Sequence, residues 1–410
     1  MIKKVCLINT YSDFNKGDLG IVLGTVTALK SSADDIEINC VSSFVKEDPF
    51  FETHHEYLKK HVNKIYSTVI GRLFSESNST LELTYKLFVD FYKMFFIYFM
   101  PLWMVKIFAL NSENNITLEL LDNSDVIISK GGSFICNRNT LKDKIRLLRE
   151  LTIIVLSLRL KKDVYILGQS IGPVYGTISR IIVEKIFSKT KKVVLRETEC
   201  LKEYKKIRVY NNVVGNDFAF NLSKDITPSE KINSGVVGLT IKRFNDHRQD
   251  KLYTNILVDI IEYIVKSGKR VHIVPHVTID DDLKKSREVV SQLDEKIKKQ
   301  VKLDTSEYDI WDLHDLYSTF DVLIGTRLHS TIFAMNVNTK VINISYHGTK
   351  SIGVFKRFGI EEYVISGNNF NIKYLKDKYD KIQKAPINYR KLAHQAAEEN
   401  INICRSILNA

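Results

Sequence analysis

Short runs of valine, isoleucine and leucine alternate along the chain with longer segments whose apolar residues recur at helical spacing. In the first half the short runs predict strands over 4–9, 36–41, 125–129, 163–167 and 192–195. The segments between them place apolar residues at i, i+3 and i+4, which predicts helices over 19–30, 142–160 and 177–187. Strands that alternate with helices indicate parallel sheets covered by helices on both faces.

The same alternation returns in the second half of the chain. It predicts strands over 235–241, 270–275, 321–325 and 340–344, and helices over 251–267, 282–298, 309–318 and 328–336. Between the halves, residues 221–234 lack an apolar period and contain Pro228, so this segment is the expected linker.

The predicted fold class is therefore α/β, with two Rossmann-like domains facing across a cleft. The first domain is expected over 1–225 and the second over 235–380. A C-terminal helix within 381–410 is expected to pack back on the first domain.

Residues 86–110 interrupt this pattern with a dense run of aromatic and apolar side chains. The uninterrupted apolar part, 94–105, is shorter than the roughly 20 residues that span a bilayer. Two interpretations stay open. The segment is either a buried helical hairpin or dimer contact, or an interfacial element with Tyr92, Tyr98 and Trp103 at headgroup level and lysines reaching outward. The second interpretation predicts peripheral contact with the inner face of the cell membrane.

Composition narrows the range of partners. The chain has 410 residues, with 60 Lys and Arg against 48 Asp and Glu, which gives a formal net charge of +12. That balance favours acidic partners such as phosphorylated metabolites. Nucleic acid is not expected, because the basic residues are scattered and no nucleic-acid-binding motif is present.

The cysteines and the N-terminus point to the cytoplasm. The five cysteines are widely separated and lack metal-ligand spacing, so neither a disulfide framework nor a metal site is expected. Asp280-Asp281-Asp282 is expected to form the first turn of a helix. The N-terminus leads directly into a strand pattern and does not resemble a signal peptide.

Polar turns follow several of the expected strands, at the edge where open α/β sheets bind ligands. These turns are Asn15-Lys16-Gly17-Asp18, Lys130-Gly131-Gly132-Ser133 and Gly168-Gln169-Ser170-Ile171-Gly172-Pro173. Backbone amides in such turns can surround a phosphate or carboxylate, and Lys130 can add positive charge. Taken singly, the first turn is better explained as an ordinary helix entry with Asp18 as its N-cap. An ordinary connection explains each of the other two turns about equally well.

Charged residues at two further strand ends indicate an anion more directly. Arg196 can hold a carboxylate or phosphate with its planar guanidinium, and the alternative is a pair with Glu197 or Glu199. Arg327 and His329 follow a strand and stand at a helix N-terminus, where both can face one bound anion.

Taken in order, these blocks resemble the polysaccharide pyruvyltransferase family. The resemblance runs over residues 4–360. It rests on Asn15-Lys16-Gly17-Asp18, Lys130-Gly131-Gly132-Ser133, Gly168-Gln169-Ser170-Ile171-Gly172-Pro173, Arg196-Glu197, Asp217, and Arg327-Leu328-His329 with Ser345-Tyr346-His347-Gly348-Thr349-Lys350. Lys130 departs from the family pattern, since many relatives have a third glycine there, and this is expected to alter the fit of donor or acceptor.

The resemblance implies a fold similar to the two-domain glycosyltransferases of the GT-B type, with phosphoenolpyruvate held between the domains. It implies that Arg196, Arg327 and His329 belong to the donor site. The implied reaction moves pyruvyl from phosphoenolpyruvate to a sugar of a cell-surface or exopolysaccharide precursor, as a ketal, with release of phosphate and without a cofactor. The acceptor is a saccharide, lipid-linked or otherwise. A GT-B-type glycosyltransferase that uses a nucleotide sugar is the alternative, because fold does not fix function.

Ketal formation requires protonation of the vinyl carbon, loss of protons from two sugar hydroxyls and departure of phosphate. Arg196 and Arg327 are predicted to hold the phosphate and carboxylate of the donor. His329 is predicted to be the general acid or to assist the leaving phosphate. Asp18 is the predicted general base, with Asp217 as its substitute. Further substrate contacts are predicted for Lys130, Gly131, Gly132, Gln169, Asp217 and Lys350.

Overall fold

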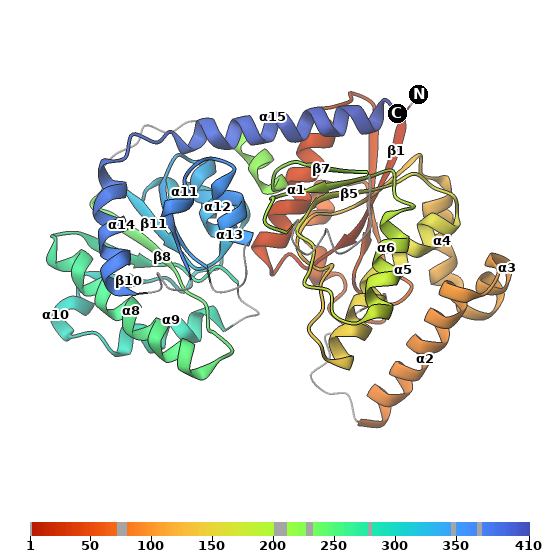
Figure 1. Cartoon of the computed structure of the whole chain (residues 1–410), viewed down its shortest axis with the longest axis horizontal. Coiled ribbons are helices and arrows are strands. Elements are labelled where there is room, and N and C mark those ends of the chain that lie inside the picture. Colours follow the sequence, from red (N-terminus) through yellow and green to blue (C-terminus); the bar gives the residue numbers. More distant parts are fainter. Residues whose placement is uncertain are drawn as a thin grey trace. The chain divides into compact units, whose positions relative to one another are not determined.

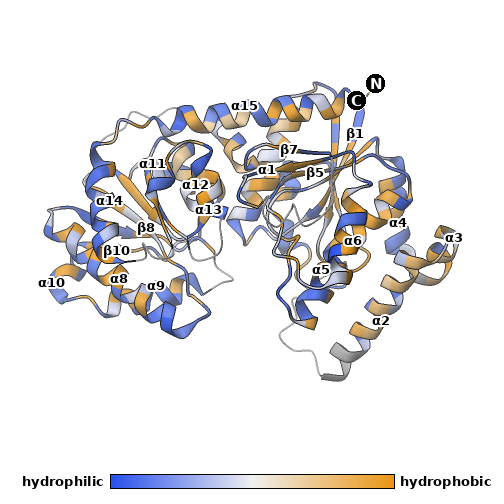
Figure 2. Ribbon diagram, viewed as in Figure 1, coloured by the Kyte–Doolittle hydropathy of each residue, from blue (hydrophilic) through white to orange (hydrophobic). Residues whose placement is uncertain are grey.

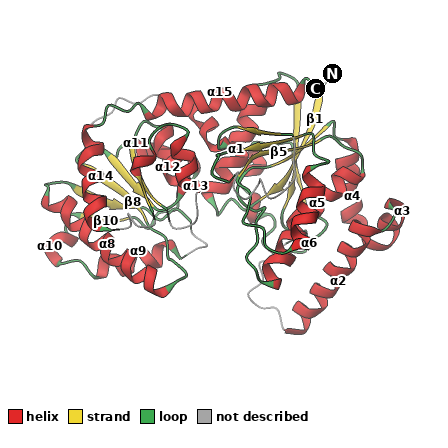
Figure 3. Cartoon of the chain, in the orientation of Figure 1, coloured by secondary structure: helices red, strands yellow, loops and turns green. Residues whose placement is uncertain are grey.

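The computed structural model describes residues 2–71, 80–200, 211–226, 233–277, 281–345, 350–366 and 371–410 (Figure 1). The chain divides into two compact units. Unit 1 comprises Met1–Asp13, Ile21–Phe218 and Asn400–Ala410, and unit 2 comprises Phe14–Gly20 and Ala219–Glu399. Each unit contains one parallel sheet with helices against it (Figure 3).

The sheet of unit 1 has seven strands. In spatial order they are β3 (Lys64–Tyr66), β2 (Ile36–Ser42), β1 (Lys3–Thr10), β4 (Val126–Ser129), β5 (Val164–Gln169), β6 (Lys192–Leu195) and β7 (Asn212–Val214). The helices of this part of the chain are α1 (Lys16–Lys30), α2 (Thr80–Phe99), α3 (Leu102–Met104), α4 (Ser112–Asn123), α5 (Leu141–Arg159) and α6 (Thr177–Phe187). The strand order reverses between β1 and β4, and such a reversal is where open α/β sheets bind ligands.

The sheet of unit 2 has six strands. In spatial order they are β10 (Val301–Leu303), β9 (Arg270–Ile273), β8 (Val236–Thr240), β11 (Val322–Gly325), β12 (Lys340–Ile344) and β13 (Val364–Ile365). Its helices are α8 (His247–Lys266), α9 (Asp282–Ser291), α10 (Glu295–Lys298), α11 (Ile310–Ser318), α12 (Leu328–Asn336), α13 (Lys350–Lys356), α14 (Ile372–Lys384) and the first part of α15 (Tyr389–Leu408). Here the order reverses between β8 and β11.

The predicted α/β class with parallel sheets is confirmed. The apolar pattern did not predict the short edge strands β3, β7, β10 and β13, because they have at most three residues each. The single helix predicted over 282–298 is wrong, because Asp294 adopts an extended backbone (φ −62°, ψ 148°) and separates α9 from α10. The expected linker begins as a 3₁₀ helix (Phe218–Lys224), and its residues 227–232 lie outside the described part.

Residues 14–20 group with unit 2, although they directly follow the first strand of unit 1. Asn15 forms an antiparallel bridge with Val277. A Cβ atom at Gly20 would lie 2.7 Å from the ring of Phe333, so this turn of α1 packs tightly on α12. The predicted first domain contained this segment. The division by contacts instead places it in the same unit as Arg327 and His329.

The aromatic segment forms helix α2, and after a break at Pro101 (φ −53°, ψ 148°) it forms α3 and a π-helical turn (Val105–Ala109). Phe88 and Phe99 on its outer side are 70% and 73% exposed, and Phe91 and Phe95 are exposed between them. Figure 2 shows hydrophobic residues along α2 and α3. The interpretation as a wholly buried hairpin is therefore wrong, because only the inner side is buried, at Met94, Ile97 and Val105. The alternative of a dimer contact stays a prediction. None of the described helices combines the length and apolar character that a bilayer span requires.

Part of the interfacial interpretation is wrong as well. Tyr98 points inward, because its hydroxyl donates to the carbonyl oxygen of Leu148 at 3.0 Å. Lys93 also points inward, since its Nζ donates to the carbonyl oxygen of Val69 at 3.3 Å and to Asn114 Oδ1 at 3.1 Å. Of the residues in this interpretation, Tyr92 and Trp103 are exposed.

Buried histidine makes unit 2 sensitive to acid. His314 Nδ1 donates to the carbonyl oxygen of Ile310 (2.7 Å). Its Nε2 therefore accepts from the side-chain amide Nδ2 of Asn336 (3.2 Å). Burial lowers the pKa of His314 from 6.5 to about 4. Between these values the unfolded chain binds a proton that the folded chain does not, so protonation favours unfolding.

We predict that the free energy of unfolding falls as pH decreases from 6.5 to 4, with His314 contributing up to about 3 kcal/mol. Urea unfolding of the wild type and of His314→Gln across this range measures the effect. The variant is expected to be less stable at pH 7 but to lose less stability on acidification. Parallel pH profiles for the two proteins would contradict the assignment.

Candidate active site

Several segments of unit 2 meet at the carboxyl edge of its sheet, beside the reversal between β8 and β11. They are the turn before α1, the loop after β9, the start of α9 and the turn between β11 and α12. Asn15 bridges Val277, and the amide of Val277 donates to Asp282 Oδ2 at 3.0 Å. Asp282 in turn holds Arg327, so one chain of contacts joins all four segments.

Arg327 is a cation at this edge whose guanidinium is held in one orientation by hydrogen bonds. Its Nη2 donates to Asp282 Oδ1 at 2.7 Å and its Nε donates to Asp282 Oδ2 at 3.3 Å. Asp282 is fully buried and Arg327 is 9% exposed. Two bonds from one guanidinium to one carboxylate fix the plane of the guanidinium. A fixed cation that need not reorganise is suited to stabilise negative charge on a phosphate or carboxylate.

Asp282 is a site residue that the sequence analysis did not identify. It was expected only as part of a helix first turn, and it does begin α9. Its pairing with Arg327 joins residues 45 positions apart in the chain. No local pattern predicts such a contact, and the only signal in the sequence was an acidic residue after the β9 strand.

His329 lies directly against the turn that begins α1. A Cβ atom at Gly17 would lie 2.3 Å from His329 Nδ1 and 2.8 Å from its Cγ. Only glycine permits this approach, because real side chains do not tolerate such distances. The structure therefore brings together two motifs, Asn15-Lys16-Gly17-Asp18 and Arg327-Leu328-His329, that are far apart in the sequence.

Asp18, the predicted general base, belongs to the same turn. Helix α1 begins at Lys16, so Asp18 lies within the first turn and is not its N-cap. Asn15 Nδ2 donates to Asp18 Oδ2 at 2.6 Å, and Asn15 Oδ1 accepts from the amide of Asp18 at 3.3 Å. These bonds fix the carboxylate within the turn whose Gly17 lies against His329.

A second histidine, His276, stands near the same edge at the end of β9. It is buried, and its Nδ1 lies 3.1 Å from the hydroxyl of Tyr317. Burial lowers the pKa of His276 well below its usual value, and the positive charges of Arg327, His329 and Lys16 lower it further. His276 is therefore neutral at physiological pH and is not suited to act as a general acid.

Unit 1 holds Arg196 in a comparable way. Arg196 Nη1 donates to Asp217 Oδ2 at 2.8 Å and Arg196 Nε donates to Ser170 Oγ at 2.7 Å, and all three residues are buried. The alternative partner, Glu197, accepts instead from the amide of Cys200 at 2.8 Å. Asn400 of α15 supports this group from behind, because its side chain donates to the Asp217 carbonyl oxygen at 3.3 Å. Asp217 thus holds Arg196.

The glycine turns of unit 1 do not supply the anion-binding amides that were expected of them. The amide of Gly132 donates to the Gly168 carbonyl oxygen at 3.1 Å, and the amide of Gly172 donates to the Ile135 carbonyl oxygen at 2.9 Å. A Cβ atom at Gly131 would lie 2.7 Å from the Gly168 carbonyl oxygen. These glycines allow two strand ends to pack closely, and their substrate-binding role is a prediction that the geometry does not favour.

The remaining predicted contacts divide between the units. Gln169 is buried beside Arg196, where its Nε2 donates to the Ser170 carbonyl oxygen at 2.9 Å. Lys130 is buried in unit 1, with its Nζ 6.0 Å from the centre of the Phe134 ring. Lys350 begins α13 in unit 2, and the preceding residues 346–349 lie outside the described part. Among the described residues, no group of three or more His, Cys, Asp or Glu could hold a metal ion.

The two Rossmann-like units place the chain in the structural class of GT-B glycosyltransferases and related epimerases. Two UDP-GlcNAc 2-epimerases have a similar fold, those of Neisseria meningitidis (TM-score 0.58, 10% identity) and Methanocaldococcus jannaschii (TM-score 0.55, 14% identity). Each alignment covers 100% of this chain and 100% of the epimerase chain. A glycosyltransferase from Rickettsia africae aligns with 100% of this chain over 97% of its own (TM-score 0.54, 12% identity). At these identities the likeness shows the fold alone.

Sequence comparison then identifies the family. The family model for polysaccharide pyruvyl transferase matches residues 15–348, and the chain belongs to this family. A relative, the amylovoran biosynthesis protein AmsJ of Erwinia amylovora, is 25% identical over 382 residues, which cover 88% of this chain and 87% of AmsJ. The family predicted from the motifs is thereby confirmed.

The contact between Gly17 and His329 predicts a specific effect of substitution. Gly17→Ala would displace the imidazole, and misplacing a catalytic group by about 1 Å typically reduces turnover about a hundredfold. Turnover and the imidazole resonances of His329 in NMR spectra measure the effect. Gly20→Ala is the control, because its methyl group would meet the Phe333 ring and not the imidazole of His329. Unchanged His329 resonances in Gly17→Ala would contradict the prediction.

Proposed function

We propose that this chain transfers pyruvyl from phosphoenolpyruvate to two hydroxyls of one sugar as a ketal, with release of phosphate. The observation that carries the proposal is the buried Arg327 guanidinium, held by Asp282 in the turn that also carries His329, in a chain of the polysaccharide pyruvyl transferase family. Phosphoenolpyruvate is a small, multiply charged anion. A preorganised guanidinium beside an imidazole that can donate a proton suits such a donor.

The proposed ketal formation balances in bonds and protons. A proton adds to the methylene carbon of the donor, and the first sugar oxygen bonds to C2. The bond from C2 to the phosphate oxygen then breaks, and the second sugar oxygen bonds to C2. The two hydroxyl protons that are lost equal the one gained by carbon and the one gained by the leaving phosphate. His329 would deliver the first proton, and Asp18 would accept a proton from a hydroxyl.

Arg327 would bind the phosphate of the donor, because it lies two residues before the proposed proton donor in the same turn. Arg196 is equally fixed, by Asp217 and Ser170, and its role in donor binding stays a prediction. The acceptor would be a saccharide of a surface polysaccharide precursor, which agrees with membership of this family.

Substitution of His329 and Arg327 tests these roles. His329→Ala is expected to retain most donor binding while kcat falls about a hundredfold or more, as for loss of a general acid. Arg327→Lys is expected to raise the donor KM, because lysine lacks the planar fork that binds phosphate. Phosphate release from phosphoenolpyruvate with a panel of oligosaccharides, followed by mass spectrometry of the acceptor, measures both.

The control for Arg327→Lys is Arg357→Lys, which changes an ion pair with Glu399 (3.0 Å) elsewhere in unit 2. Wild-type turnover in His329→Ala would remove this residue from catalysis. Release of a nucleotide from a sugar donor, without phosphate release from phosphoenolpyruvate, would replace the proposal with the glycosyltransferase alternative.

We also propose that helix α2 rests on an anionic membrane. The exposed face of Phe88, Phe91, Phe95 and Phe99 supports this contact, together with Trp103, which is 62% exposed. Large exposed apolar faces mark sites of association, and tryptophan favours the membrane interface. The net charge of +12 favours a negative surface over a second copy of the same cationic chain. The enzyme would then work as a peripheral protein at the inner face of the membrane.

Vesicle binding tests this contact. The triple substitution of Phe88, Phe95 and Phe99 by serine is expected to weaken binding to phosphatidylglycerol vesicles at least about tenfold, because burying each phenylalanine contributes roughly 1.5–3 kcal/mol. Leu252→Ser, at an exposed leucine of α8, is the control. Unchanged binding, or a change in dimerisation in place of vesicle binding, would contradict the proposal.

A further inference from the structure

His276, in the loop after β9, has one buried ring nitrogen without a hydrogen-bond partner. The side chain is 3% exposed, and its Nδ1 lies 3.1 Å from the hydroxyl of Tyr317. Its Nε2 forms no hydrogen bond within the part of the chain that the structure describes. Buried polar atoms in folded proteins are nearly always hydrogen bonded, because leaving one without a bond is costly. Such a nitrogen beside the candidate active site indicates a bound ligand.

The hydrogen bond with Tyr317 determines which nitrogen of His276 carries the proton. The Tyr317 hydroxyl is buried, and burial raises the pKa of Tyr317, so the phenol keeps its proton. Among the described residues no group other than His276 Nδ1 bonds to this hydroxyl, so its proton is donated to Nδ1. The neutral imidazole then carries its own proton on Nε2, where it is an N–H donor.

Positive charges lie close to this imidazole. After burial, which has the larger effect, the charges of Arg327, His329 and Lys16 lower the pKa of His276. Lys16 is brought near by the antiparallel bridge between the turn before α1 and the loop after β9. The carboxylate of Asp282 is bound to Arg327. The surroundings of His276 therefore favour a negatively charged ligand.

The first turn of α1 and the start of α12 lie side by side with their N-termini at the same end. A Cβ atom at Gly17 would lie 2.3 Å from His329, and a Cβ atom at Gly20 would lie 2.7 Å from Phe333, one turn further along α12. Helix N-termini carry partial positive charge and amide groups without intrahelical partners, so two such ends together attract an anion. The His276 ring belongs to the same cluster, because its centroid lies 5.5 Å from that of Phe333.

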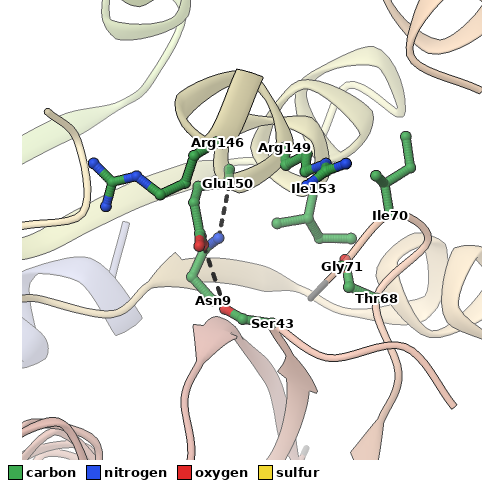
Figure 4. A pocket seen from close by; sticks show the side chains of 9 residues that line it. All are labelled: Asn9, Ser43, Thr68, Ile70, Gly71, Arg146, Arg149, Glu150 and Ile153. Carbon is green, nitrogen blue, oxygen red and sulfur yellow. Dashed lines mark hydrogen bonds between the residues drawn. The ribbon is translucent and has the colours of Figure 1, made fainter. Parts of the chain in front are cut away.

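The polar pocket of unit 1 does not converge on a ligand in this way (Figure 4). Its carboxylate belongs to Glu150, whose carbonyl oxygen accepts from Asn9 Nδ2 at 2.8 Å. Arg146 and Arg149 extend to opposite sides of Glu150. Arg149 pairs with Asp90 at 2.7 Å, and Arg146 Nη2 donates to a backbone carbonyl oxygen at 3.1 Å. These cations are bound to the protein itself, so the surroundings of His276 are the better candidate.

Of the two anionic groups of phosphoenolpyruvate, the phosphate fits this cluster better. A carboxylate has two oxygens in one plane, which a single guanidinium can bind. A phosphate has three terminal oxygens and a larger charge, and it can accept from several separate donors at once. An imidazole N–H group, an ammonium and a guanidinium from three different segments match that shape.

We infer that His276 is a further residue of the donor site and that its Nε2–H group donates to the phosphate of phosphoenolpyruvate. Lys16 adds positive charge there, and Tyr317 is a positioning residue that holds the proton on Nε2. The inference rests on the proposed function, because it concerns the donor of that reaction. Negative charge on the phosphate grows as its bond to C2 breaks. A neutral donor that keeps its proton stabilises this charge without competing with His329 for the role of acid.

NMR spectra of the full chain with isotope-labelled histidine test the inference without any substitution. The proton of His276 is expected on Nε2 in the wild type. Its Nε2 signal is expected to shift on addition of inorganic phosphate or phosphoenolpyruvate, and not on addition of pyruvate. His314 is the internal control, because both of its ring nitrogens already form hydrogen bonds. A proton on Nδ1 overturns the inference, and an equal shift with pyruvate overturns the assignment to the phosphate.

Substitution gives a second readout. His276→Leu removes the N–H group, whereas His276→Gln keeps an amide N–H group at nearly the same position. The dissociation constant of phosphoenolpyruvate, from isothermal titration, is expected to rise about tenfold or more in His276→Leu, as for loss of a hydrogen bond to a charged group. It is expected to be largely restored in His276→Gln. Equal losses in the two variants, or no loss in either, would refute the contact.

Matched controls make the same changes away from this cluster. His272→Leu replaces another buried histidine of the β9 segment, whose Nε2 lies 2.9 Å from Asp304. Lys16→Gln is expected to weaken phosphoenolpyruvate binding, and Lys30→Gln, at the other end of α1, is expected to leave it unchanged. Thermal unfolding verifies that each variant is folded. A loss of binding in His272→Leu equal to that in His276→Leu would contradict the specific role of His276.

Separate probes distinguish this inference from the proposed function. If phosphoenolpyruvate fails to bind the wild type while inorganic phosphate still moves the His276 signal, the proposed function is wrong and the phosphate subsite stands. If phosphoenolpyruvate binds and leaves the His276 signal in place, the subsite alone is overturned.

Discussion

The buried ion pair between Arg327 and Asp282 is the interaction on which the candidate site depends. Removing one partner from such a pair typically costs about 3–5 kcal/mol, because the other charge is then buried alone. The pair also connects the start of α9, the loop after β9 and the turn before α12. The same contact that orients a guanidinium for an anion therefore fixes the shape of the loops around it.

Unit 1 uses the same arrangement. Arg196 follows a parallel strand, and Asp217, from a later part of the chain, holds it. In both units the arginine comes from a strand end and the carboxylate from another segment. A carboxylate at this distance lowers the cost of burying a cation and restricts its rotamers, so each arginine presents its remaining donors in one direction.

The sequence was sufficient to predict the regular elements and the positions of the two arginines, since apolar period and strand ends are local patterns. The sequence did not reveal which carboxylates pair with these two arginines. Asp282 resembles any acidic residue in a helix first turn, and Glu197 seemed a closer partner for Arg196 than Asp217. The glycines at 131 and 132 suggested an anion site, yet they serve close packing of two strand ends. Each of these outcomes depends on tertiary contacts that no local pattern contains.

The path of the chain has a consequence for dissecting the molecule. It passes between the units after residues 13, 20, 218 and 399, so neither unit is a continuous stretch of sequence. A fragment that ends at Phe218 would lack Asn400, whose side chain binds the backbone of Asn216 and Asp217 and so supports Arg196. It would carry residues 14–20 without the α12 surface on which they pack. Separating the halves by truncation would thus damage the surroundings of both Arg196 and Arg327, and point substitutions in the intact chain are the appropriate way to study either one.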